Sequence, residues 1–112
     1  VVLEDGVTLF TEPCECILNR HPQASRTALV GVDVEGQINP VIVIEPMDRE
    51  LHKSKASCAK LIQEMSRLAK SKLETNRIER FLIYPGRLPT DIRHNSKIFR
   101  EKLQTWAQAE LN

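Results

Sequence analysis

The pattern of apolar and polar positions first predicts a set of β-strands. Apolar residues flank Asp5-Gly6 in "VVLEDGVTLF", and such a pair between apolar runs is a strong β-hairpin signal. The stretches "RTALVGVDV" and "PVIVIEP" are rich in β-branched residues and are separated by a turn at Glu35-Gly36. We predict that these two strands pair as an antiparallel hairpin. A further strand, "RFLIYP", ends at a Pro-Gly pair.

Helical spacing appears in three other stretches. Thr11 is placed to cap a short helix over "EPCECILNRH", which has Pro13 in its first turn and ends at His21-Pro22, because the residue before a proline avoids helical geometry. A long helix is predicted from about Ser54 to Leu73. Its apolar stripe consists of Cys58, Leu61, Ile62, Met65, Leu68 and Ala69.

The last predicted helix runs from about Ser96 to Glu110, with Asn95 as its N-cap. Its predicted buried face consists of Phe99, Leu103, Trp106 and Ala107. The order of elements is then β-hairpin, α, β, β, α, β, α. We predict an α+β fold in which a small mixed β-sheet, preceded by the N-terminal hairpin, is covered by about three helices. At 112 residues, positions 1–112 form a single domain with its own core.

Composition excludes some classes of partner. The apolar fraction is 41%, the charged fraction is 28% and the net charge is +1, which leaves no electrostatic footprint for nucleic acid or an anionic membrane. No apolar run approaches the ~18 residues of a transmembrane segment, and no signal-like segment opens the chain. Three cysteines are an odd number that fits free thiols in a reducing cytosol, so we expect a cytoplasmic protein.

Basic residues crowd the predicted start of the last helix. Arg93, His94 and Lys97 lie where the helix dipole disfavours cations by roughly 0.3–1 kcal/mol each. One interpretation is an anion site, in which a phosphate or carboxylate binds these side chains and the free N–H groups of the helix. The other is that Asp91 and Glu101 neutralise the cations and the basic groups point into water. Charge pattern alone leaves both interpretations open and favours the second.

Other candidate sites are weaker. Cys14-x-Cys16 does not have the spacing of a C-x-x-C zinc or redox site, and Cys14 and Cys58 fit small core residues better. His21 lies where it can bond the last carbonyls of its helix, and His52 has no Cys or His partner at metal-ligand spacing. No metal site is predicted. The chain also contains no nucleotide-cradling glycine loop of its own.

The C-terminal stretch "LPTDIRHNSKIFREKLQTWA" resembles the lysine-bearing motif of AMP-forming acyl-activating enzymes. The common form of that motif is P-[RK]-T-x-x-G-K-x-x-R, which Pro89, Lys97 and Arg100 match. This chain has two extra residues between the proline and the lysine and lacks the glycine. That departure, together with "LFTEPCECILNRHP" and "RTALVGVD", is similar to fatty-acid–CoA ligase-like proteins, including the olefin β-lactone synthetases. Pro13-x-Glu15 resembles the P-x-E that follows the family's hinge.

The resemblance spans nearly the whole chain and implies a C-terminal lid domain that is inactive alone. A larger N-terminal domain would carry the ATP-binding loop and the acyl pocket, and the hinge would lie upstream of Val1. Lys97 would be the adenylation lysine, with Arg93, His94 and Arg100 as substrate- or phosphate-binding residues. The lid would rotate for a second half-reaction and present the hairpin near the hinge. Gly6 is the candidate there, although this loop is longer than the family's common one by about two residues.

Three functions follow as hypotheses. The first is the lid of a fatty-acid–CoA ligase, acting on a carboxylic acid with ATP, Mg²⁺ and CoA, all bound mainly by the N-terminal domain. The second is the lid of a β-lactone synthetase, in which the adenylate of a β-hydroxy acid closes on its own hydroxyl without CoA. The third, from a different class, is a non-enzymatic small α/β binding module.

Overall fold

The structure is a computed structural model that describes residues 1–3, 5–91 and 97–111. Within these residues, three α-helices, one 3₁₀ turn and five strands follow one another. In order they are α1 (Thr11–Leu18), β1 (Ala24–Val34), β2 (Gln37–Pro46), η1 (Leu51–Lys53), α2 (Lys55–Lys70), β3 (Arg80–Ile83), β4 (Thr90–Asp91), β5 (Lys97–Ile98) and α3 (Arg100–Leu111).

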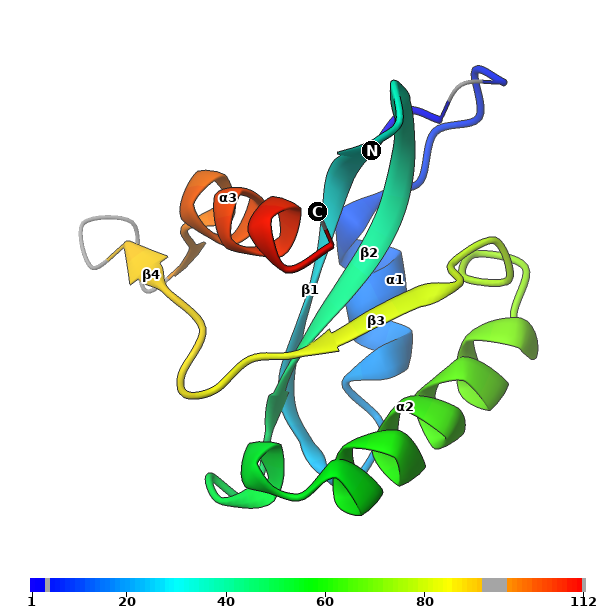
Figure 1. The fold of residues 1–112 in the computed structure, drawn as a ribbon. Helices are drawn as coiled ribbons and strands as arrows, with labels where there is room; N and C mark the ends of the chain where they lie inside the picture. The colour runs from blue at the N-terminus through cyan, green and yellow to red at the C-terminus, as the bar shows by residue number, and fades with distance from the viewer. Residues whose placement is uncertain (4, 92–96, 112) are drawn as a thin grey trace.

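The main sheet has the strand order β1-β2-β3 (Figure 1). The strands β1 and β2 form the predicted antiparallel hairpin, with Leu29 opposite Ile42, and β3 adds to β2 in parallel, with Phe81 opposite Ile42. The separate pair β4-β5 is antiparallel. A mixed sheet with three α-helices confirms the predicted α+β class.

Both faces of the sheet are covered, which explains the nearly continuous β-branched runs in β1 and β2. On one face, Leu29, Ile42 and Ile44 belong to a core with residues of α1 and α2. The opposite face packs against α3 through a second core. Its buried members are Ala28, Val30, Val32, Val41, Val43, Leu88, Leu103 and Ala107. The sheet therefore separates α3 from the other two helices (Figure 1).

The long helix follows the prediction closely. Ser54 is its N-cap and accepts a hydrogen bond from the amide of Ser57 at 3.2 Å. The predicted apolar stripe faces the first core: Leu61, Met65 and Ala69 are buried, and Cys58, Ile62 and Leu68 are partly buried against it.

The first helix differs in its boundaries. Thr11 is its first residue rather than its cap, and the cap position falls to Phe10, which makes no side-chain capping bond. The helix ends at Leu18, before His21-Pro22. The His21 imidazole does not bond the last carbonyls. Its Nε2 lies 2.8 Å from Glu64 Oε1, so it joins the turn after α1 to α2.

The predicted start of the last helix is wrong. The helix α3 begins at Arg100 rather than at Ser96, because the preceding residues pair with another segment. Lys97 lies opposite Asp91 in the β4-β5 pair, and the amide of Phe99 donates to the carbonyl of Pro89 at 2.8 Å. The predicted cap, Asn95, lies outside the described residues. Lys97 is therefore a strand residue and not part of a helix N-terminus.

The N-terminal hairpin is present in short form. Val2 and Thr8 form an antiparallel bridge, and the amide of Gly6 donates to the carbonyl of Leu3 at 2.9 Å. Gly6 has a φ of +83°, which a glycine adopts without strain and which makes the tight reversal possible. Within the described part of the chain, no helix is both long enough and apolar enough to cross a membrane.

Candidate functional site

The predicted catalytic lysine is exposed and available. Lys97 extends from β5, immediately before α3, and its side chain makes no hydrogen bond or ion pair with any residue that the structure describes. Arg93 and His94 lie outside the described residues, so the cluster that they would form with Lys97 stays a prediction. An exposed ammonium group on a short paired strand can bind an anion supplied from outside this chain.

Arg100, the other basic residue of the C-terminal motif, is held by Glu15 of α1. Its Nη1 and Nη2 donate to the two carboxylate oxygens at 2.7 and 3.0 Å, and Nη1 also donates to the Leu29 carbonyl at 3.1 Å. Glu15 Oε2 in turn accepts a hydrogen bond from the Leu29 amide at 2.8 Å. Two-point pairing of this kind is strong and directional. It joins the P-x-E segment to the lysine motif. The role of Arg100 as a phosphate ligand stays a prediction.

Further side chains of α3 bind the free edge of β1. Gln104 donates from Nε2 to the Gly31 carbonyl at 2.8 Å. Gln108 donates to the Asp33 carbonyl and accepts from the Asp33 amide at 3.0 Å. Arg100, Gln104 and Gln108 are spaced by four residues, one helical turn, and their partners on β1 are spaced by two. They satisfy backbone groups that an edge strand otherwise offers to another chain.

The sequence pattern does not predict these contacts. Glu15 is recognisable only as part of a motif, and no motif assigns a role to Gln104 or Gln108. The available signal was the polar series at positions 100, 104 and 108 of one helix face, which lies beside the apolar series of Leu103 and Ala107. That series alone does not identify β1 as the strand to which these side chains bind.

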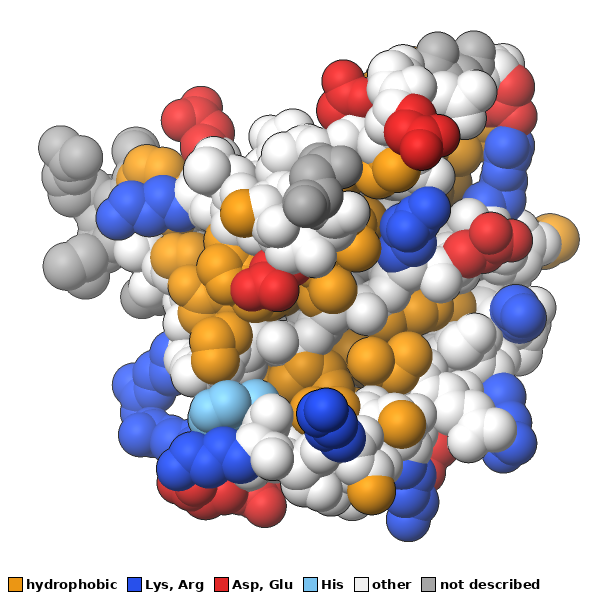
Figure 2. Space-filling model, in the orientation of Figure 1, with side chains coloured by type: hydrophobic (Ala, Val, Ile, Leu, Met, Phe, Trp, Pro, Cys, Tyr) orange, Lys and Arg blue, Asp and Glu red, His pale blue; other side chains and the backbone are white. Residues whose placement is uncertain are grey.

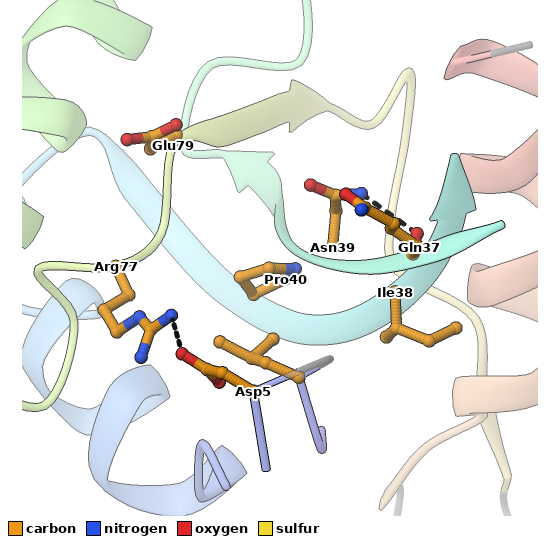
Figure 3. A pocket seen from close by; sticks show the side chains of 8 residues that line it. Asp5, Gln37, Ile38, Asn39, Pro40, Arg77 and Glu79 are labelled. Atoms are coloured by element: carbon orange, nitrogen blue, oxygen red, sulfur yellow. Dashed lines mark hydrogen bonds and ion pairs between the residues drawn. The ribbon is translucent and has the colours of Figure 1, made fainter. Parts of the chain in front are cut away.

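A second polar region surrounds the N-terminal hairpin (Figure 3). A cavity of about 410 Å³ is lined there by Leu3, Asp5, Gln37, Ile38, Asn39, Pro40, Arg77 and Glu79. Arg77 points toward Asp5 and pairs with it. The hydrogen bond from Arg77, and then the one from the Val7 amide, hold the pKa of Asp5 below its ordinary value. The stabilisation from the Asp5–Arg77 pair is therefore fully present at a pH above the ordinary pKa of an aspartate. It is lost as the pH falls through the lowered pKa of Asp5.

The hairpin and β4 lie well apart, at the upper right and at the left of the view in Figure 1. Gly6 is at the tip of the hairpin, next to Asp5, whereas Lys97 is in β5. The two predicted functional regions are thus separate surfaces, and the structure does not bring Gly6 and Lys97 together. Among the described residues, no three metal-binding side chains gather into a candidate metal site.

The three cysteines lie in different surroundings. Cys14 is 1% exposed and its Sγ donates to the Glu74 carbonyl at 3.2 Å, as expected for a core residue. Burial, and then the charges of Glu15 and Glu74, raise the pKa of the Cys14 thiol. Cys58 is partly buried and Cys16 is exposed.

We expect a thiol reagent to modify Cys16 first and Cys14 last in the native chain, because the reactive species is an accessible thiolate. Mass spectrometry after timed alkylation at neutral pH would give the three rates. Denaturant is the control and should bring the rates together. If Cys14 reacted in the native chain as fast as Cys16, its place in the core would be wrong.

Known proteins resemble this chain both in sequence and in fold. No family model matches the chain. It is 42% identical over 99 residues to an olefin β-lactone synthetase of Xanthomonas campestris pv. campestris, which covers 88% of this chain. It is 38% identical over 103 residues to an olefin β-lactone synthetase of Stenotrophomonas maltophilia, which covers 92% of it. The chain spans 17% and 18% of the lengths of these two relatives.

A solved structure completes the comparison. The anthranilate CoA ligase AuaEII, in complex with anthranoyl-AMP, superposes on 95% of this chain with a TM-score of 0.73 and 22% sequence identity, and 19% of that chain is covered. The chain matches a C-terminal domain of the adenylate-forming superfamily. The resemblance drawn from the lysine motif and the P-x-E segment is thereby confirmed at the level of the superfamily.

Within the adenylate-forming superfamily, the relatives and structural neighbours indicate the C-terminal domain of an adenylate-forming ligase. They do not bear on the roles of individual residues. The assignments of Lys97, Arg93, His94 and Gly6 therefore remain predictions that rest on the motif and on the geometry described above.

Proposed function

We propose that this chain is the lid of an AMP-forming enzyme that activates a carboxylic acid, with Lys97 as its catalytic residue. The observation that carries the proposal is an exposed lysine that pairs with no described residue and that precedes a firmly anchored arginine, Arg100, in the spacing of the superfamily motif. The lid would act with an N-terminal adenylation domain of the same protein, which would bind ATP, Mg²⁺ and a carboxylic acid such as a fatty acid.

The adenylation reaction needs a cation of the kind that Lys97 would supply when the lid closes. A carboxylate oxygen attacks the α-phosphorus of ATP, a new P–O bond forms, and pyrophosphate leaves. The attack brings two anions together, so an ammonium group placed between them lowers the barrier by stabilising the charge of the transition state. Closure of a lid also excludes water, which would otherwise hydrolyse the acyl-adenylate.

For the second half-reaction, we propose β-lactone formation. The support is the similarity to two proteins named olefin β-lactone synthetases, at 42% and 38% identity. In this reaction, the β-hydroxyl of the acyl-adenylate attacks its own carbonyl and the ring C–O bond forms. The bond between the acyl carbon and the phosphate oxygen breaks, AMP leaves, and the hydroxyl proton passes to solvent. The CoA ligase is the second candidate. It rests on the wider resemblance and on neighbours such as AuaEII, whose likeness at 22% identity extends only to the fold.

The deciding experiment uses the full-length parent protein with ATP, Mg²⁺ and a β-hydroxy fatty acid, with and without CoA. We expect AMP and a β-lactone in both reactions. The matched control is the fatty acid of equal length without the hydroxyl group, which should support ATP–pyrophosphate exchange but yield no lactone. A thioester formed only with CoA, and no lactone, would overturn the lactone assignment in favour of the ligase.

Residues 1–112 alone serve as a further control and should form no acyl-AMP, since the lid is proposed to supply a lysine and not an ATP site. Acyl-AMP formation by this chain alone would contradict that division of labour. A parent protein that folds but activates none of these acids would favour the third hypothesis, a binding module.

A further inference from the structure

Glu15 lies on α1 and Lys97 on β5, yet the contacts of Arg100 connect the two. We propose that Glu15 is a positioning residue: by holding Arg100, it fixes the start of α3 and with it the strand that carries Lys97. The inference rests on the proposed role of Lys97 in adenylation. It assigns to Glu15, and to Arg100, a function in setting the geometry of a lysine that neither residue touches.

The segment that connects Arg100 to Lys97 is short and held by other parts of the domain. The two residues are separated by Ile98 and Phe99 only. Ile98 lies opposite Thr90 in the β4-β5 pair and packs partly buried against the second core, and the Phe99 amide donates to the Pro89 carbonyl at 2.8 Å. A displacement of the first turn of α3 is therefore transmitted to β5 rather than absorbed by a loose linker.

The other end of the connection is rigid as well. Glu15 extends from α1, whose neighbouring residues Cys14 and Leu18 are buried in the first core at 1% and 0% exposure. The Glu15 side chain is 12% exposed, and its Oε2 also accepts the Leu29 amide at 2.8 Å. The carboxylate is thus fixed by α1 and by β1 before it meets the arginine, and two-point pairing then fixes the guanidinium plane.

Arg100 is the only one of the three β1-binding residues of α3 that lies in its first turn. Gln104 and Gln108 hold the helix one and two turns further on, through the carbonyls of Gly31 and Asp33. Buried Leu103 and Ala107 pack the helix against the sheet in the second core. Loss of Glu15 should therefore loosen the start of α3 while the rest of the helix stays docked, so the effect should fall on Lys97 more than on folding.

Glu15 also removes an electrostatic conflict. A cation in the first turn of a helix is disfavoured by the helix dipole, and an anion there is favoured. Arg100 opens α3, and the Glu15 carboxylate lies against it at 2.7 Å. The pair therefore presents little net charge at this point and leaves Lys97 as a separate cation.

The test is a comparison of Glu15→Gln with Glu12→Gln in the full-length parent. Both changes remove one carboxylate charge from α1, but Glu12 is exposed and lies one turn away from the pair with Arg100. We expect Glu15→Gln to lower kcat for ATP–pyrophosphate exchange by about 10- to 100-fold, the scale of a small misplacement of a catalytic group, with little change in KM. Glu12→Gln should match the wild type. Arg100→Lys, which keeps the charge but loses the two-point pairing, should resemble Glu15→Gln and serves if that variant does not fold.

A double-mutant comparison separates positioning from general damage. If Glu15 acts through Lys97, then Glu15→Gln should lower exchange no further when Lys97 is already alanine. An equal fractional loss in both backgrounds would overturn the inference, and so would wild-type exchange in folded Glu15→Gln. The proposed function fails separately: it is refuted if Lys97→Ala alone leaves exchange unchanged, whatever Glu15→Gln does.

Discussion

Replacing Lys97 by alanine in the full-length parent should lower substrate-dependent ATP–pyrophosphate exchange by about 100-fold or more. This is the scale of losing one key electrostatic contact with the charge that develops in a transition state. The effect should be large because the Lys97 ammonium binds no described residue of its own domain, so its whole positive charge is available to the substrates. Its removal should leave the fold intact for the same reason.

Lys102→Ala is the matched control for this measurement. Lys102 is an exposed lysine of α3, five residues further along the chain, whose ammonium lies 5.3 Å from the centre of the Phe99 ring. Its loss removes the same charge from the same region and should change exchange by less than about 2-fold, since an exposed charge of this kind contributes little. Unchanged exchange in a folded Lys97→Ala protein, shown by circular dichroism, would make Lys97 a solvated surface lysine. The motif assignment would then be wrong despite the shared fold.

The parts of the fold that could be predicted are those with strong local signals. The β1-β2 hairpin has a turn at Glu35-Gly36 between two β-branched runs, and α2 has both a serine cap and an apolar stripe of about three turns. In these elements, local preference and burial favour the same structure. The α+β class then follows from the order of the elements alone.

The start of α3 could not be predicted in this way. Asn95 and Ser96 are good helix-cap residues, and the apolar spacing that follows is helical. The strands β4 and β5 have only two residues each, too few to show a strand pattern. Their pairing joins residues on either side of positions 92–96 and overrides the local helix preference. The consequence matters for function, because it moves Lys97 from a helix terminus to a strand.

The interpretation of the basic cluster changes accordingly. The sequence predicts cations at a helix N-terminus and leaves open whether a bound anion neutralises them or whether Asp91 and Glu101 do, with the second favoured. The structure gives a partial answer from within the domain: Arg100, a cation in the first turn of α3, is paired with the carboxylate of Glu15. These two residues are 85 positions apart in the sequence. Each belongs to a recognisable motif, but only the folded structure shows that they are in contact.

The largest expected loss of stability comes from Leu103→Ala. Leu103 is 0% exposed and lies in the second core between α3 and the sheet, among Val30, Val32, Val41 and Val43. Truncation of a buried leucine removes its transfer free energy and leaves a cavity, which together cost roughly 2–5 kcal/mol of unfolding free energy. Urea unfolding of residues 1–112, followed by far-UV circular dichroism, would measure this. Leu73→Ala is the control. Because Leu73 is 87% exposed, the unfolding free energy of this variant should stay within about 0.5 kcal/mol of the wild-type value.

The slope of the unfolding transition adds a second criterion. If the domain unfolds as one unit, Leu103→Ala should lower the midpoint and leave the m-value unchanged, because the same surface is exposed on unfolding. A lower m-value would mean that α3 detaches from the sheet before the rest of the domain unfolds. That outcome would bear on the lid itself, since α3 carries Arg100 and directly follows the strand of Lys97. A loss below 0.5 kcal/mol would contradict the docking of α3 described here.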